Sequence, residues 1–111
     1  YTRDATLAGK QTLSGLLGIP RKITVIAGIG NTKKYSYGIY STYDGLQIIL
    51  RNLEGIYFPG YDAIVLLHGT TLLDKITGII SNVTATSFDI DWTVMGTPPT
   101  GTIEIAVSID Y

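Results

Sequence analysis

The chain has 111 residues, a formal net charge of -1 and no cysteine. This length corresponds to one domain and is sufficient to bury a hydrophobic core. Only 15% of the residues are charged, whereas soluble domains average about 25%. The small net charge argues against an electrostatic nucleic-acid binder, and the absence of cysteine excludes disulfides and cysteine-based metal sites. The deficit of charge is a first indication that partner molecules cover part of the surface.

Residues 1–21 differ in pattern from the rest of the chain. Glycines at positions 9, 15 and 18 interrupt their apolar residues, and neither a strand nor a helix period persists. We therefore expect an extended N-terminal arm over residues 1–21 and a β-sandwich domain over residues 22–111. A partly apolar, irregular arm is typical of segments that pack on a neighbouring molecule. The candidate interface residues of the arm are its four leucines: Leu7, Leu13, Leu16 and Leu17.

Three later segments alternate apolar and polar residues with the period of two that marks a half-buried strand. They cover residues 22–29, 87–94 and 102–111, and Trp92 belongs to the predicted buried set. A loop rich in proline and glycine joins the last two strands. We therefore expect these two strands to pair as an antiparallel hairpin with one buried face.

The remaining predicted strands are shorter or less regular. They are expected at residues 34–43, 63–67 and 75–83. Six to seven short strands separated by turns are typical of a β-sandwich. The sequence therefore predicts a mainly β fold, an antiparallel β-sandwich that carries the extended N-terminal arm.

One segment between the strands is ambiguous. The apolar residues at positions 46–53 fit the i, i+3, i+4, i+7 spacing of a helix, and they also fit a buried strand. Asp44 and Gln47 have the spacing of a capping box, and Gly55 follows where a helix would end. We therefore favour one short helix over residues 45–53.

Residue types that enzymes use are sparse and scattered. His68 is the only histidine, and its place after an apolar run predicts a strand end. No nucleophile-elbow, phosphate-loop or complete dinucleotide-binding motif occurs. Asp89 and Asp91 share the polar face of one strand, so we interpret them as solvated carboxylates rather than a catalytic pair. We expect no enzymatic activity, no cofactor, no metal site and no nucleic-acid partner, and the lack of a long apolar run predicts no membrane insertion.

Aromatic side chains are the strongest functional lead. Four tyrosines fall within residues 35–43, and further aromatic residues belong to a loop with Pro-Gly turn chemistry. Alternation places Tyr40 on the opposite face from the other three, so the four cannot all lie in the core. Tyrosine rings with polar tips suit protein interfaces and sugar stacking. The candidates for a subunit interface or a glycan contact are Tyr35, Tyr37, Tyr40, Tyr43, Tyr57 and Tyr61.

Two stretches of the chain resemble known modules. Residues 76–92 resemble the hairpins of small β-sandwich modules in bacteriophage virion proteins, and residues 101–109 are similar to the last strand of those modules. The sequence Asn-Val-Thr-Ala-Thr-Ser-Phe at residues 82–88 is also similar to H-type-lectin-like and fibronectin-like sandwiches. The N-terminal segment resembles the arms by which capsid and tail subunits tie to their neighbours.

The resemblance to phage proteins implies a non-enzymatic structural component located in the virion, either a head decoration, a fibre or a tail subunit. Such a subunit would form a homo-oligomer and contact other virion proteins through its arm and its tyrosine-rich surfaces. The alternative is a carbohydrate-binding module that contacts host-surface glycans through exposed tyrosines.

Overall fold

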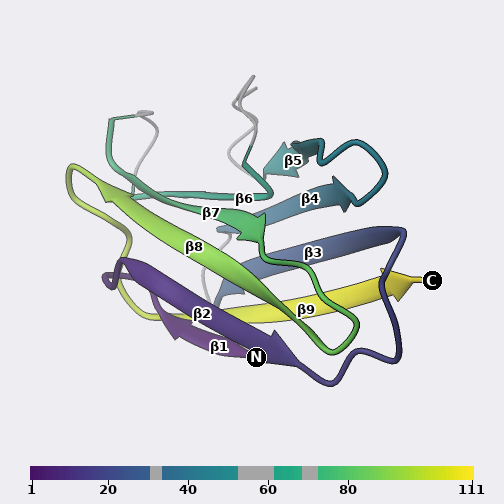
Figure 1. Ribbon diagram of the computed structural model, residues 1–111. Coiled ribbons are helices and arrows are strands. Elements are labelled where there is room, and N and C mark those ends of the chain that lie inside the picture. Colours follow the sequence, from purple (N-terminus) through teal and green to yellow (C-terminus); the bar gives the residue numbers. More distant parts are fainter. Residues whose placement is uncertain (31–33, 53–61, 69–72) are drawn as a thin grey trace.

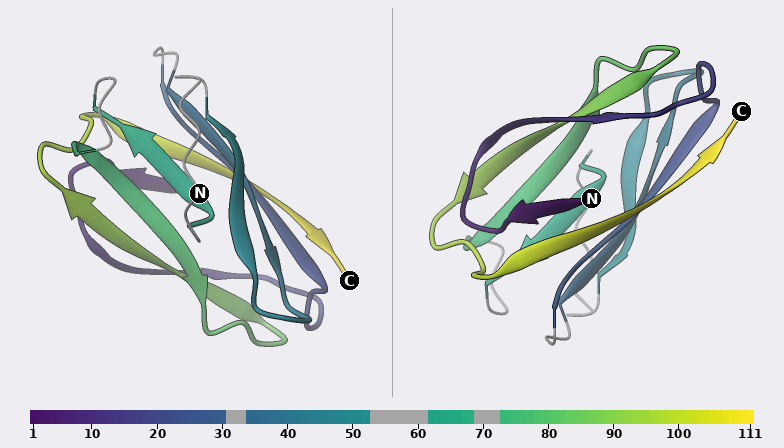
Figure 2. Two further views of the ribbon diagram at one scale, coloured as in Figure 1. Left: turned by 90° about the horizontal axis from the view of Figure 1, so that it is seen from above. Right: turned by 90° about the horizontal axis from the view of Figure 1, so that it is seen from below.

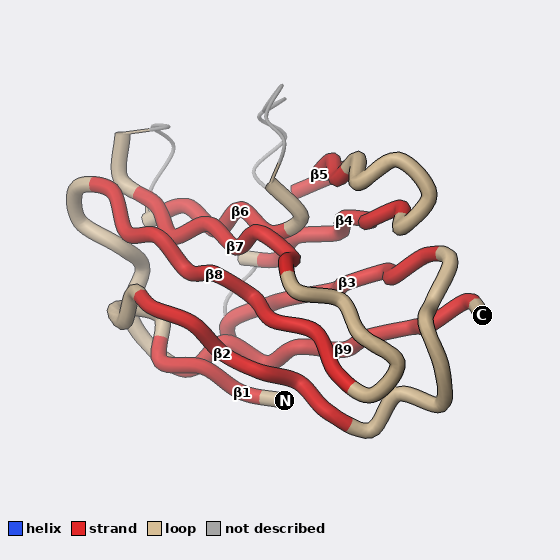
Figure 3. Tube along the Cα trace, in the orientation of Figure 1, coloured by secondary structure: helices blue, strands red, loops and turns tan. Residues whose placement is uncertain are grey.

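The computed structural model describes residues 1–30, 34–52, 62–68 and 73–111. Within these ranges the chain contains nine β-strands and no helix, arranged as two antiparallel sheets that pack face to face (Figures 1 and 3). The predicted mainly β, two-layered fold is confirmed, with nine strands in place of six to seven.

The strands of the described chain divide into a five-stranded sheet, here sheet A, and a four-stranded sheet, here sheet B (Figure 2). In spatial order, sheet A consists of β1 (Thr2–Asp4), β9 (Thr102–Asp110), β3 (Lys22–Ile29), β4 (Tyr35–Ser41) and β5 (Gln47–Asn52). Sheet B consists of β2 (Gly9–Ser14), β8 (Ser87–Met95), β7 (Lys75–Ser81) and β6 (Ile64–Leu67).

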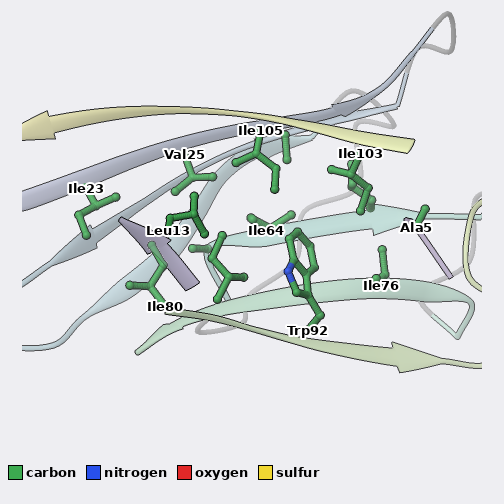
Figure 4. Packing of buried hydrophobic residues seen from close by; sticks show 14 of the residues in the cluster. Ala5, Leu13, Ile23, Val25, Ile64, Ile76, Ile80, Trp92, Ile103 and Ile105 are labelled. Atoms are coloured by element: carbon green, nitrogen blue, oxygen red, sulfur yellow. The ribbon is translucent and has the colours of Figure 1, made fainter. Parts of the chain in front are cut away.

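The hydrophobic core lies between the inner faces of the two sheets (Figure 4). Strand β3 shows the alternation that builds it, because Ile23 and Val25 are fully buried while Ile26 points outward. Trp92 is buried as predicted, and its indole N–H donates to the Oε1 atom of Gln11 at 3.0 Å. The buried core consists of Ala5, Leu13, Ile23, Val25, Ala27, Ile29, Ala63, Ile64, Leu66, Ile76, Ile80, Phe88, Ile90, Trp92, Ile103 and Ile105.

Strands β8 and β9 do not pair with each other, so the predicted hairpin is wrong. β8 lies between β2 and β7 in sheet B, whereas β9 lies between β1 and β3 in sheet A. The loop of residues 96–101 carries the chain from one layer to the other. An alternating pattern determines which face of a strand is buried, but it does not determine which strand lies beside it.

The predicted short helix over residues 45–53 is also wrong within the described residues, because Gln47–Asn52 form strand β5. The apolar spacing that suits a helix suits a strand as well. Here β4 provides a ladder partner for β5, with Tyr40 opposite Gln47 and Ser36 opposite Asn52. The tertiary pairing therefore decides between the two conformations.

The N-terminal segment forms part of the sandwich and is not an extended arm. β1 pairs with β9 and β2 pairs with β8, so the segment adds an edge strand to each sheet. Leu13 is 1% exposed in the core, and Leu16 packs against it. Gly9 and Gly15, which interrupt the sequence pattern, adopt positive φ angles at the two ends of β2. The glycines that interrupt the alternating pattern in the sequence thus lie where the chain turns.

A buried glutamine joins the two sheets. Strand β6 begins at Ile64, which pairs with Gly78 of β7. The backbone of Ile80, further along β7, therefore extends beyond the start of β6 and has no β6 residue opposite it. The Gln47 side chain, 8% exposed, satisfies both backbone groups of Ile80. Its Nε2 atom donates to the Ile80 carbonyl at 3.0 Å, and its Oε1 atom accepts from the Ile80 N–H at 2.7 Å. The carboxamide therefore takes the position that a further strand residue would occupy.

Side chains of sheet A also cover the outer edge of β6. The Val65 N–H donates to the Ser36 hydroxyl at 3.1 Å, and the ammonium group of Lys34 donates to the Leu67 carbonyl at 2.8 Å. These bonds satisfy backbone groups of an edge strand whose four residues are buried.

Gly38 lies in close contact with the backbone just before β6. A β-carbon at this position would overlap the carbonyl oxygen of Ala63, so only glycine lets β4 approach the start of β6 this closely. A register shift in the β4–β5 ladder lies directly before it, between Tyr37 and Gly38.

Replacing Gln47 by leucine is expected to destabilise the fold strongly. The substitution leaves the N–H and C=O groups of Ile80 buried without partners, and each such group costs about 1–3 kcal/mol. We expect the free energy of unfolding to fall by about 3 kcal/mol. Urea unfolding followed by the fluorescence of Trp92 measures this change.

The matched control is Gln11→Leu, which changes the only other glutamine in the chain. The Gln11 amide also donates one bond, to the Thr2 carbonyl at 2.9 Å, and accepts one, from Trp92 at 3.0 Å. It is half-buried, so water replaces much of what is lost, and we expect a fall of about 1 kcal/mol. Equal losses in the two variants would contradict the bridging role of Gln47.

Candidate functional site

The two outer faces of the sandwich carry different chemistry. The outward residues of β2 and β8 in sheet B are mainly hydroxyl, carboxylate and amine side chains. In sheet A the outward residues of β4 include Tyr35, Tyr37 and Ile39, with Ile48 beside them on β5 and Ile26 on β3, whereas the outward residues of β9 are mainly polar. This difference is the clearest functional feature of the described chain.

Internal hydrogen bonds satisfy the polar face of sheet B. The Asp89 carboxylate accepts from the Thr12 hydroxyl at 2.6 Å and from the Asn82 amide at 2.9 Å, and the Lys10 ammonium lies 3.8 Å away. The bond from Thr12, then that from Asn82, and finally the charge of Lys10 hold the pKa of Asp89 below its ordinary value, against the opposing effect of burial.

The residues with catalytic potential do not converge. The Asp91 carboxylate accepts a bond from the Ser81 hydroxyl at 2.6 Å, so it links β8 to β7. His68 is exposed just after the end of β6. Across residues 1–30, 34–52, 62–68 and 73–111, no three acidic or histidine side chains gather as a metal site requires. In the same ranges no helix has the length and hydrophobicity to cross a membrane.

Apolar side chains gather on part of the outer face of sheet A. Ile26 on β3 lies between Tyr37 on β4 and Ala106 on β9. Ile26 is 45% exposed and Tyr37 is 36% exposed. Exposed apolar patches on soluble proteins mark interaction sites. We name this surface the apolar face, and it consists of Ile26, Tyr35, Tyr37, Ile39, Ile48 and Ala106.

A depression of about 560 Å³ lies at one end of the apolar face. The surface is hollowed here because Gly28 on β3 has no side chain. Its register neighbours, Tyr35 on β4 and Glu104 on β9, do have side chains and form the walls. Tyr1 and Thr2 line the side beyond β9. We name this depression the Gly28 hollow. An aromatic ring and an exposed carboxylate therefore lie on opposite sides of a cavity with a mixed polar and apolar lining, to which Lys34 also contributes.

The structure separates the candidate tyrosines. Tyr35 and Tyr37 lie on the apolar face, as the alternation predicts, and Tyr40 points inward and packs against the core. Tyr43 is 98% exposed in the turn after β4, beyond the strand on which it was predicted. Two further candidates lie outside the described residues: Tyr57 and Tyr61.

The four leucines of the predicted arm also separate. Leu13 is buried in the core, so it is not available to a partner. Leu16 is half-buried and packs against the core. Leu7 is 53% exposed and Leu17 is 90% exposed, so these two are the most accessible of the four.

The sequence pattern does not reveal the Gly28 hollow. Gly28, Tyr35 and Glu104 come from three strands, and only the register of those strands brings them together. The sequence does contain one indication of an apolar surface on this sheet, since Ile26 is an isoleucine at an outward position of a clearly alternating strand.

Comparison of the chain with protein-family models, with curated proteins and with solved structures finds no match. The function therefore has to be inferred from the chemistry of the two outer faces and of the Gly28 hollow.

The low pKa of Asp89 predicts acid-sensitive stability. Because the pKa in the folded state lies below the ordinary value of 3.8, Asp89 stabilises the fold above about pH 4, and this contribution is lost as the pH falls through the folded pKa. Thr12→Val removes the hydrogen bond with the largest effect. We expect this variant to be less stable at neutral pH and to show a flatter loss of stability below pH 4.

Acid unfolding followed by Trp92 fluorescence, with a carboxyl NMR titration of Asp89, measures both effects. Thr93→Val is the control, because Thr93 is an exposed threonine of β8 that makes none of these bonds. An unchanged pKa of Asp89 in Thr12→Val would contradict the assigned cause.

Proposed function

We propose that this chain is a non-enzymatic structural subunit of a bacteriophage virion and that it assembles through the apolar face. The observation that carries the proposal is the difference between the two outer faces. Hydrogen bonds within sheet B satisfy its Asp89 and Asp91 carboxylates, and Asp89 is only 8% exposed, so it is not the solvated carboxylate that the sequence predicts. The isoleucine and tyrosine side chains of sheet A have no such partners and are stabilised by a covering surface. The resemblance of residues 76–92 and 101–109 to phage sandwich modules provides the biological setting.

A second exposed apolar spot supports an assembly role. Leu17 is 90% exposed, Ile19 is 62% exposed and Tyr111 is 48% exposed. The Leu17 N–H donates to the Tyr111 hydroxyl at 2.8 Å, so these residues are held together at one end of the sandwich. Part of the N-terminal segment thereby keeps a contact role, although its strands belong to the sandwich.

The proposal is tested on purified phage particles whose genome encodes this chain. Quantitative mass spectrometry is expected to find the chain as a multicopy component. Tyr37→Asp is expected to reduce incorporation at least about tenfold, because burying an unpaired carboxylate costs more than about 1.4 kcal/mol. Ile79→Asp is the control, since Ile79 is 38% exposed on the outer face of sheet B. Absence of the parent chain from particles would overturn the virion assignment, and normal incorporation of Tyr37→Asp would overturn the role of the apolar face.

The Gly28 hollow favours one second candidate function, the binding of a glycan. The Tyr35 ring offers a stacking surface, and the Glu104 carboxylate accepts hydrogen bonds from sugar hydroxyls. On a glycan array, Tyr35→Ala is expected to weaken binding at least about tenfold, the loss of one stacked ring. Tyr43→Ala is the control because Tyr43 lies in a turn outside the hollow. An array on which the parent chain binds nothing would reject this candidate.

A further inference from the structure

We propose that the occupant of the apolar face is a second copy of this chain, packed face to face about a twofold axis that runs along β3. The inference rests on the proposed function, because it takes the apolar face as the assembly surface. It adds the identity of the partner and the geometry of the contact.

The side chains on the two sides of β3 differ in size. In the register, Ile26 has Tyr37 on its β4 side and Ala106 on its β9 side. A rotation of 180° about β3 exchanges these sides, so that Tyr37 of each copy comes to lie over Ala106 of the other. Packed layers need large side chains to face small ones, and a twofold contact needs a surface that is complementary to itself. Tyr37 and Ala106 meet both conditions, while Ile26 on the axis faces its own copy.

The same rotation also fills the Gly28 hollow. Gly28 has Tyr35 on its β4 side and Glu104 on its β9 side, at equal distance in the register. The rotation therefore places Tyr35 of the second copy over Glu104, in a hollow of about 560 Å³. There the Tyr35 hydroxyl donates to the Glu104 carboxylate. The Tyr35 side chain and the Gly28 hollow that would receive it from a second copy thus lie on the same face of the chain.

The polar ends of the face agree with this arrangement. The ion pairs between described residues are Lys10–Asp89 and Lys22–Asp110, so Glu104 takes part in neither. Lys22 lies at the other end of β3, where its twofold copy would approach it. Its ammonium is 3.1 Å from the Asp110 carboxylate, which neutralises that end of the face.

The dimensions of the face suit a small dimer. Its four longer strands, spaced about 4.8 Å apart and about 26 Å long, give roughly 500 Å² in projection per copy. Two copies therefore bury roughly 1,000 Å², which is the lower bound for a specific interface. An axis along β3 keeps the strands of the two copies nearly aligned, as in other packed sheets.

Cysteine cross-linking tests the position of the axis, because the chain has no cysteine of its own. Ile26 lies on the proposed axis, so the two thiols of Ile26→Cys face each other across the interface. Facing sheets lie about 10 Å apart, which is too far for a direct disulfide, so a short bis-maleimide is expected to convert most of the protein into a covalent dimer. Ile79→Cys is the matched control. It replaces an isoleucine of similar exposure, 38% against 45%, on the outer face of the other sheet, and it is expected to form no covalent cross-link.

A second set of variants tests the exchange of the two sides. The double variant Tyr37→Cys with Ala106→Cys is expected to cross-link, since each thiol faces its counterpart on the second copy. Either substitution alone is expected to give no covalent cross-link, because the rotation separates equivalent positions on β4 and on β9. Circular dichroism of the reduced variants establishes that each one is folded.

The outcomes separate this inference from the proposed function. Cross-linking at position 26 and not at position 79 supports the twofold dimer. Equal cross-linking at both positions reflects random collision and overturns it. No cross-linking at position 26, in a chain that phage particles still incorporate through Tyr37, overturns the dimer and assigns the apolar face to another virion protein. Absence of the chain from particles overturns the proposed function, whatever the cross-linking shows.

Discussion

The carboxamide of Gln47 replaces a missing stretch of strand. β6 is shorter than β7, and the backbone groups of Ile80 that extend past β6 are buried and need partners. One glutamine side chain provides both a donor and an acceptor, and it reaches Ile80 from the opposite sheet. The edge strand of sheet A is thereby tied to sheet B by two hydrogen bonds in the interior, where losing them is most costly.

The orientation of β4 and β5 follows from this bridge. Gln47 must point inward to reach Ile80, and its ladder partner Tyr40 points inward with it. Strand geometry then turns the adjacent residues, Ile39 and Ile48, outward. The inward Gln47 and Tyr40 thus accompany the outward positions of Ile39 and Ile48 in the apolar face.

The sequence predicts the structure best where one face of a strand is buried and the other is not. β3, β8 and β9 show such alternation, and the buried faces predicted for them are found. β5 has no such contrast, because it places an amide inward and an isoleucine outward, so its spacing resembles that of a helix. The pairing of β8 and β9 was equally out of reach, since neighbours in a sheet are chosen by contacts distant in sequence.

The same distinction applies to the candidate site. Alternation predicts that Tyr35 and Tyr37 face away from Tyr40, and this is found. The hollow beside Tyr35 depends on a glycine of β3 and a carboxylate of β9 in matching positions of the register. That coincidence is a property of three paired strands and not of any one segment.

Strand β9 has a consequence for how the chain reaches its fold during synthesis. It lies between β1 and β3, yet it follows every other described strand in the chain. The Ile105 N–H donates to the Tyr1 carbonyl at 2.8 Å, which joins β9 to the residue directly before β1. Until Thr102–Asp110 leave the ribosome, β1 has no neighbour and one edge of β3 is open. Sheet A therefore closes only after β9 has emerged, and the nascent chain carries an unpaired strand edge until then.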